Sequence, residues 1–223
     1  MATVVNKSDW SQVAGFLDAY DTKRELIIKR CRDSQKLAKH AVYSLHRGDI
    51  AQAAKQLQEV EGIAQELLPV IQQHPSLRAG SYAASMEEYA EAQAFLYFLR
   101  EGRLVAAKEL PLVEPEEYLG GILDMTGELN RYAVLRATAR DTAAVARCRD
   151  LVDSMMGKFL QLNLRNGNLR KKYDVLKYTL KKLENTLYEL SLTSALGVNR
   201  APASGEEEAM LGVCAQPVER EDA

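Results

Sequence analysis

Several residue types and segments are scarce in this chain of 223 residues. Only three cysteines occur, Cys31, Cys148 and Cys214, and their wide spacing excludes a disulfide framework and a zinc-type cluster. No run approaches the roughly 18 apolar residues that a membrane-spanning helix needs. The N-terminus MATVVNKSDW also lacks the apolar core of a signal peptide. We therefore expect a protein with no membrane partner that works in the cytoplasm or, in a eukaryote, also in the nucleus.

Proline is rare as well, with six residues in the chain and none between positions 116 and 201. Long uninterrupted helices are favoured where this helix-breaking residue is missing. The alternating apolar pattern of a β-strand is absent over any useful length, whereas apolar residues recur at helical intervals. The sequence therefore predicts an all-α fold, a bundle of about seven helices in a single domain over residues 1–200.

The apolar spacing and the turn residues place these helices. The expected ranges are 8–46, 49–73, 82–101, a short helix at 104–109, a helix that starts near Pro115, and two further helices at 141–163 and 169–195. Gly48 and Gly102 are expected to end helices, and Asp49 is expected to cap the start of one. Residues 201–223 mix proline, glycine and acids, which predicts a disordered acidic tail.

Charge is distributed unevenly, although the formal net charge is only -2. Residues 21–47 hold eight Lys or Arg and three acids, and residues 165–182 hold seven Lys or Arg and one acid. The last 23 residues hold six acids and one Arg. Basic regions of this kind attract phosphate-bearing partners, although solvated helix faces have the same composition.

Four carboxylates stand inside otherwise apolar helical stretches. Glu88 and Glu91 are three residues apart in MEEYAEAQAFLYFL, and Asp124 and Glu128 are four apart in YLGGILDMTGELNRYAVL. These spacings place each pair on one helix face. Burying an unpaired carboxylate costs on the order of several kcal/mol, and a nearby cation can offset this cost. A hard divalent cation such as Mg2+ prefers oxygen ligands, so a metal site is one interpretation.

Structural roles explain the same acids without a metal. Ser85 and Glu88 fit a capping box at a helix start, which would make Glu88 structural. Glu128 could pair with Arg131 or Arg24, and Asp124 could pair with a buried lysine. Glu91 has no such alternative role in the sequence.

Several ordered motifs resemble the family of translin and translin-associated factor X over roughly residues 9–195. EEYAEAQAFLYFL and YLGGILDMTGELNR are similar to the two acidic helices of the family's catalytic members, and YDTKRELIIKRCRDSQKLAKHAVYSLHRGD is similar to their opening helix. The stretch LNLRNGNLRKKYDVLKYTLKKLENTLYELSL resembles the last, basic helix of the translin type.

This resemblance implies a hollow homo-octamer, or another closed homo-oligomer, that binds single-stranded RNA and DNA inside. It also implies Mg2+-dependent, or Mn2+-dependent, endoribonuclease activity with Glu88, Glu91, Asp124 and Glu128 as metal ligands. The chain lacks the insertion between the acidic helices and the basic N-terminus of eukaryotic catalytic members. It combines acidic helices of the catalytic type with a last helix of the translin type, so we expect a self-sufficient homo-oligomer, unless a translin-type partner chain exists.

The basic regions then gain a partner, since Lys and Arg contacts to phosphate supply most sequence-independent affinity for nucleic acid. The predicted contacts are Arg24, Lys29 and Arg32 in the first helix, and Arg170, Lys171, Lys172, Lys177 and Lys181 in the last. Two other functions remain open: a single-stranded RNA and DNA binding oligomer without catalysis, and a helical scaffold whose basic faces pair with acidic neighbours.

Overall fold

The computed structural model describes residues 6–195, and these residues form helices joined by turns and short loops. The α-helices are α1 (Lys7–His46), α2 (Ile50–Gln73), α3 (Ala83–Glu101), α4 (Pro115–Thr138), α5 (Thr142–Phe159) and α6 (Asn168–Ala195). Three short helical segments lie between them, η1 (Pro75–Leu77), η2 (Arg78–Tyr82) and η3 (Ala107–Glu109). The expected all-α class is confirmed. The acidic tail predicted for 201–223 lies outside the described residues.

Local chemistry explains the helix ends that were predicted correctly. The Asp49 carboxylate accepts a hydrogen bond from the Gln52 amide at the start of α2, and Gly48 takes a left-handed conformation just before it. Gly102 ends α3 with a φ of 69°, a backbone angle that glycine adopts without strain. Pro115 opens α4, where its missing amide hydrogen is not needed.

Three details of the sequence prediction were wrong. The capping box of Ser85 and Glu88 does not form, because α3 begins at Ala83 and Ser85 is a buried residue that donates its hydroxyl to Ser34 of α1. The helix expected at 104–109 shrinks to the single turn of η3. The helix expected at 141–163 ends at Phe159, after which a turn leads to the loop before α6.

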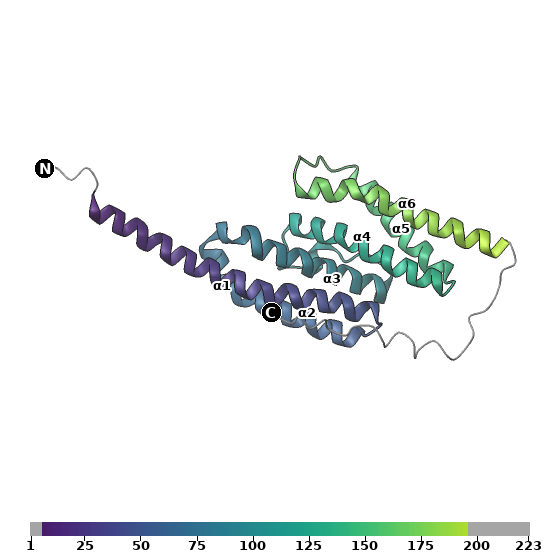
Figure 1. Cartoon of the computed structure of the whole chain (residues 1–223), viewed down its shortest axis with the longest axis horizontal. Coiled ribbons are helices and arrows are strands. Elements are labelled where there is room, and N and C mark those ends of the chain that lie inside the picture. Colours follow the sequence, from purple (N-terminus) through teal and green to yellow (C-terminus); the bar gives the residue numbers. More distant parts are fainter. Residues whose placement is uncertain (1–5, 196–223) are drawn as a thin grey trace, which may run out of the picture.

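The helices are stacked so that α3 and α4 form the centre of the bundle (Figure 1). Helix α3 packs against α1, α2 and α4, while α4 packs against α3, α5 and α6. Helices α1 and α2 therefore lie on one side of this central pair, and α5 and α6 lie on the other (Figure 1). Side chains from α1 and α2 and from α5 and α6 therefore pack around the central pair from opposite sides.

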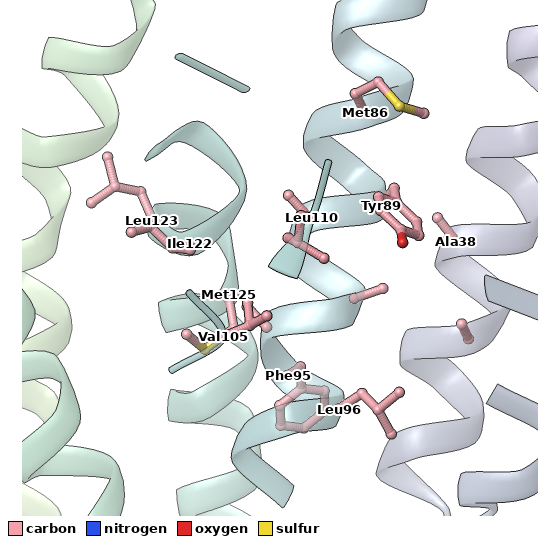
Figure 2. Packing of buried hydrophobic residues seen from close by; sticks show 14 of the residues in the cluster. Ala38, Met86, Tyr89, Phe95, Leu96, Val105, Leu110, Ile122, Leu123 and Met125 are labelled. Atoms are coloured by element: carbon pink, nitrogen blue, oxygen red, sulfur yellow. The ribbon is translucent and has the colours of Figure 1, made fainter. Parts of the chain in front are cut away.

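The core follows this order. Figure 2 shows α3, with Tyr89 and Phe95, between α1, which carries Ala38, and α4, which carries Ile122 and Met125. Phe95 and Met125 are completely buried. Burial of a large apolar side chain stabilises a fold by roughly 1.5–3 kcal/mol, so the burial of these two residues stabilises the centre of the bundle.

The first half of α1 differs from the rest, because it projects beyond the bundle (Figure 1). Trp10, Val13, Phe16 and Leu17 are between 51% and 66% exposed there, although their spacing is that of a buried helix face. None of the helices in the described residues is both long and apolar enough to cross a membrane. The exposed apolar stripe belongs to an amphipathic helix face that no other element covers within residues 6–195.

Candidate functional site: carboxylates between α3 and α4

The four predicted carboxylates lie at the contact between the two central helices. Glu88 and Glu91 come from α3, Asp124 and Glu128 come from α4, and all four side chains are partly buried. The electrostatic environment of Glu91 includes the other three carboxylates. The structure thus brings the predicted set together from two helices.

Gly121 allows the two helices to approach this closely. A Cβ atom at this position would lie 2.6 Å from the carbonyl oxygen of Glu87, 2.7 Å from the Cβ of Ala90 and 2.8 Å from the amide nitrogen of Glu91. Two of these neighbours are backbone atoms that cannot move aside. The glycine therefore sets the distance between the acids of α3 and those of α4.

Glu91 is the acid of this set whose charged form is stabilised least by neighbouring side chains. No hydrogen bond or ion pair to its carboxylate occurs within residues 6–195. Burial raises the pKa of Glu91 to about 8, with the charges of Glu88, Asp124 and Glu128 acting in the same direction and the charge of Lys172 opposing them. Close to neutral pH this side chain is poised between its neutral and its charged form.

Glu128 is supported by a histidine. Its Oε2 lies 2.5 Å from Nε2 of His46 at the end of α1, and the Arg131 guanidinium is 3.8 Å away. The His46 ring also contacts Phe95, at 4.9 Å between ring centroids. The hydrogen bond from His46 lowers the pKa of Glu128 despite the opposing effect of burial. Glu128 is therefore a fixed, ionised carboxylate.

Glu88 and Asp124 pair with lysines from opposite sides of the bundle. The Lys39 ammonium of α1 lies 3.3 Å from Glu88, and the Lys39 side chain is 65% exposed. The Lys172 ammonium of α6 contacts both Asp124 and Glu87. Burial lowers the pKa of Lys172, but hydrogen bonds to Asp124 and Glu87 outweigh it and raise the pKa above its usual value. Lys172 is therefore a cation.

The donor set suits a hard divalent cation in its chemistry, because four carboxylates with partial burial offer the oxygen ligands that Mg2+ prefers. In geometry the fit is incomplete. Across residues 6–195, no three His, Cys, Asp or Glu side chains are arranged to hold a metal ion. Three of the four acids instead direct an oxygen toward a basic side chain. Binding of a metal would require at least one of these pairs to open.

Three contributors to the site were not assigned to it from the sequence: Glu87, His46 and Lys39. Their partners are between 49 and 85 residues away in the chain, so no local pattern connects them. One signal for Glu87 was available in the glycine pair of YLGGILD. A Cβ on Gly120 would lie 2.1 Å from the Glu87 carboxylate, so the glycine provides the space for that group.

The predicted nucleic-acid contacts form two groups on opposite sides of the bundle (Figure 1). Exposed members are Arg24, Lys29 and Arg32 on α1, and Arg170, Lys171, Lys177 and Lys181 on α6. Arg24 pairs with Asp21 at 3.9 Å and Arg170 with Asp174 at 3.1 Å. Lys172 differs from the others, since it is partly buried and directed at the acids. Helices α3 and α4 separate the two basic groups within one chain.

A hollow of about 1000 Å³ is lined in part by Glu87, the residue before Glu88 in α3. Its lining includes Arg78, Glu117 and Asn168, the first residue of α6. Arg78 donates hydrogen bonds of 2.9 and 2.7 Å to the two carboxylate oxygens of Glu117, which closes one wall. The hollow gives water and small ions a route to Glu87.

Comparison with known proteins agrees with this architecture. Translin of Gallus gallus is 40% identical over 90 residues, which are 40% of this chain and 38% of that protein. Translin of Mus musculus is 36% identical over 129 residues, or 51% of this chain and 55% of that protein. Translin-associated protein X of Rattus norvegicus is 24% identical over 219 residues, and the match covers 79% of this chain and 75% of that protein. The chain thus spans between 38% and 55% of the length of the translins it matches.

Solved structures share the fold. The crystal structure of apo-NeC3PO has a TM-score of 0.75 at 24% identity and covers 85% of this chain and 100% of its own. The structure of an AfC3PO and duplex RNA complex has a TM-score of 0.69 at 18% identity, with 83% and 97% covered. The sequence pattern described as Translin family matches residues 22–194, which include both acidic helices and nearly all of α6. This protein therefore belongs to the translin family.

Proposed function

We propose that this protein binds single-stranded RNA and DNA and hydrolyses RNA with the help of Mg2+, or Mn2+ in its place. The observation that supports catalysis most is the convergence of Glu88, Glu91, Asp124 and Glu128 around a partly buried Glu91 that has no partner in the described residues. A cation at this point would offset both the burial and the repulsion that raise the pKa of Glu91. These four carboxylates are the proposed metal ligands.

The four carboxylates share one role in this proposal, which is to bind the cation. Glu88 and Glu91 of α3 and Asp124 and Glu128 of α4 hold the cation from facing helices. His46 keeps Glu128 ionised for this role. A bound divalent cation would supply Lewis acidity, which makes a water more acidic and neutralises charge on a phosphodiester. The protein positions these groups and the RNA strand, so that the scissile bond lies close to the acids.

The exposed Lys and Arg side chains of α1 and α6 are the proposed phosphate contacts. Their positions on opposite sides of the bundle fit a strand that passes between subunits rather than along one chain. Binding through phosphates weakens steeply with salt. For a single strand, the logarithm of the association constant falls by roughly 0.7 per phosphate contact for each tenfold rise in salt concentration. A salt titration with a labelled oligonucleotide measures the number of contacts.

Assembly is part of the proposal. The apolar stripe of α1 with Trp10, Val13 and Phe16 is exposed in the single chain, and exposed apolar faces of this kind mark protein interfaces. We expect a closed homo-oligomer such as an octamer, with a mixed assembly in which a translin-type chain replaces some copies as the other arrangement. Light scattering distinguishes both from a monomer of 24.9 kDa.

Three observations favour a second candidate function, nucleic-acid binding without catalysis. The ammonium of Lys172 already contacts Asp124, and the described carboxylates are not arranged as a metal site. The similarity to translins is also higher, at 40% and 36% identity, than the 24% to translin-associated protein X, although it spans a shorter stretch. In this alternative the contacts of Glu88, Glu128 and Asp124 with basic side chains are permanent.

A nuclease assay separates the two functions. Purified protein is incubated with a labelled single-stranded RNA, the matching DNA and an RNA duplex, with Mg2+, with Mn2+ or with EDTA. We expect cleavage of single-stranded RNA that EDTA abolishes and that falls at least about a hundredfold in Glu91→Gln or Asp124→Asn. Glu116→Gln, an exposed acid in the first turn of α4, is the matched control. Retained binding without turnover in either metal would establish the binding function instead.

A further inference from the structure

Lys172 connects the last helix to the centre of the bundle. Its ammonium contacts one carboxylate oxygen of Asp124 in α4 and one of Glu87 in α3. The Lys172 side chain is 27% exposed, whereas Lys39, which pairs with Glu88, is 65% exposed. Lys172 is thus a bridge between two acids of different helices, held in partly buried surroundings.

The bridge rests on a prepared position on the acidic side. The Glu87 carboxylate lies directly over Gly120, where a Cβ atom would approach its Oε2 to 2.1 Å. A larger residue at Gly120 would force this carboxylate out of its present position. The glycine therefore makes room for a carboxylate whose hydrogen-bond partner is the ammonium.

The basic side is fixed as well. Tyr173, next to Lys172, stacks on Phe159 of α5 with ring centroids 5.7 Å apart. Leu176, one turn further along α6, is 1% exposed. These contacts hold the first turns of α6 in place, so the Lys172 side chain starts from a fixed backbone and reaches toward the acids.

The basic partners of the cluster do not compete equally with a metal. His46 supports Glu128 through one of its oxygens, and Lys39 is largely in solvent. Lys172 is the cation whose contact engages Asp124 in the described part of the chain. A positive charge so close to a carboxylate oxygen opposes any second cation at that oxygen, because like charges repel strongly in partly buried surroundings.

We propose that Lys172 is an internal counter-cation that occupies Asp124 until a divalent metal displaces it, and that it thereby sets the metal affinity of the site. This inference rests on the proposed function, because it assumes that Asp124 is a metal ligand. Metal binding then requires the ammonium of Lys172 to leave Asp124 while Glu87 retains it. The site has a closed form, in which Lys172 bridges Glu87 and Asp124, and an open form, in which Asp124 is available to the metal.

Metal affinity of the RNA-free protein tests this inference without any activity measurement. Mn2+ alone is titrated into the wild type, Lys172→Met and Lys172→Arg, with bound metal measured by electron paramagnetic resonance and by calorimetry. Lys182→Met removes an exposed charge from the same helix away from the acids and is the matched control. Lys172→Gln replaces the Met variant if circular dichroism shows that the latter does not fold.

We expect Lys172→Met to bind Mn2+ at least about tenfold more tightly than the wild type, a factor that corresponds to ~1.4 kcal/mol of relieved competition. Lys172→Arg and Lys182→Met should stay within about threefold of the wild type, because the first keeps the charge and the second removes a distant one. A second readout is amine labelling followed by mass spectrometry. Lys172 should react faster in the presence of Mn2+, since the metal frees its ammonium from Asp124.

The outcomes separate the two levels of the proposal. If the wild type binds Mn2+ and Lys172→Met binds it no more tightly, Lys172 does not compete and the inference is wrong, while the metal site stands. If neither protein binds Mn2+, the metal site itself is wrong, and the inference falls with it. If Lys182→Met tightens binding as much as Lys172→Met, the effect is one of overall charge, which also overturns the inference.

Discussion

The first half of α1 and the contact between α3 and α4 depart from the usual distribution of side chains in opposite ways. In α1, Phe16 and Trp10 are 66% and 64% exposed, although they have the spacing of a buried face. Between α3 and α4, carboxylates are partly enclosed by apolar side chains such as Phe95. One region exposes what is ordinarily buried, and the other buries what is ordinarily exposed.

The two departures differ in how they are compensated. Three of the four acids have partners in the same chain, since His46, Lys39 and Lys172 reach them from α1 and α6. The apolar stripe of α1 has nothing of the kind in the described residues, because this part of the helix stands away from the bundle. A buried charge must be balanced for the chain to fold, whereas an exposed apolar face can wait for a second chain.

The largest effect on the stability of the single chain is expected at Gly121. In Gly121→Val the side chain would collide with backbone atoms of Glu87 and Glu91, so α3 and α4 would have to separate. We expect the free energy of unfolding to fall by about 3 kcal/mol or more. Urea denaturation followed by circular dichroism measures this.

Gly127 in the same helix provides the control. A Cβ atom there meets nothing within 4 Å, and the residue is exposed. Gly127→Ala should stabilise the protein by about 0.5–1 kcal/mol, since alanine is the better helix former. Equal losses in both variants would show that helix propensity, and not the approach of α3 to α4, decides the outcome.

The next effect concerns the pH dependence of stability through Glu91. Its pKa of about 8 in the folded state lies above the ordinary value of 4.5, so the folded protein holds a proton that the unfolded chain releases. The stabilisation from this proton is complete below pH 4.5 and is lost as the pH rises to about 8. We expect the wild type to lose roughly 2–4 kcal/mol between pH 5 and pH 8 through this residue.

Glu91→Gln removes this titration while it preserves the size of the side chain. Its stability should match that of the wild type at pH 5 and exceed it at pH 8, as measured by urea denaturation across this range without added metal. Parallel pH profiles for the two proteins would mean that Glu91 is solvated and has an ordinary pKa in the folded chain.

A smaller loss is expected when the partner of Glu128 is removed. In His46→Ala the carboxylate loses its hydrogen bond at 2.5 Å and Phe95 loses its contact with the imidazole ring. We expect the free energy of unfolding at pH 7 to fall by about 1–3 kcal/mol, the range for a buried polar group left without its partner.

The sign of the pH dependence gives this prediction a second check. The pKa of Glu128 is lowered in the folded state, so the stabilisation is present above the ordinary value and is lost as the pH falls. The gap between His46→Ala and the wild type should therefore narrow in acid. His40→Ala, an exposed residue on the same helix, should change stability by less than about 0.5 kcal/mol.

Much of the fold was predictable because helix ends depend on neighbours in the chain. Gly102, Asp49 and Pro115 act through their own backbone or through an amide three residues away, and each marks the predicted end. The start of α3 was not predictable in this way. Ser85 looks like a capping residue in sequence, but its hydroxyl is bonded to Ser34 of α1, a contact 51 residues away that no local pattern contains.

In the candidate site, too, local features were predictable from the sequence and long-range contacts were not. That Glu91 lies among three other acids followed from spacing on two helices and from the family resemblance. The partners that balance those acids did not follow, because Lys172 and His46 reach them from helices more than 40 residues away in the chain. A buried lysine near Asp124 was one open alternative in the sequence, and only the packing of α6 on α4 identifies it as Lys172.

The smallest effect on single-chain stability is expected in the first half of α1, and this contrast tests the comparison most directly. Phe16→Ser combined with Leu17→Ser should change the free energy of unfolding by less than about 0.5 kcal/mol, because both side chains are already more than half exposed. The same substitutions should reduce the mass measured by light scattering toward the 24.9 kDa of a monomer. Gln12→Ser, at a polar position in the same half of α1, should leave this mass unchanged. If the wild type is itself a monomer, or if the double variant keeps its assembly, the apolar stripe is not an interface. In that case the exposed face of α1 would have no second chain to cover it, whereas three of the enclosed acids would keep their partners in α1 and α6.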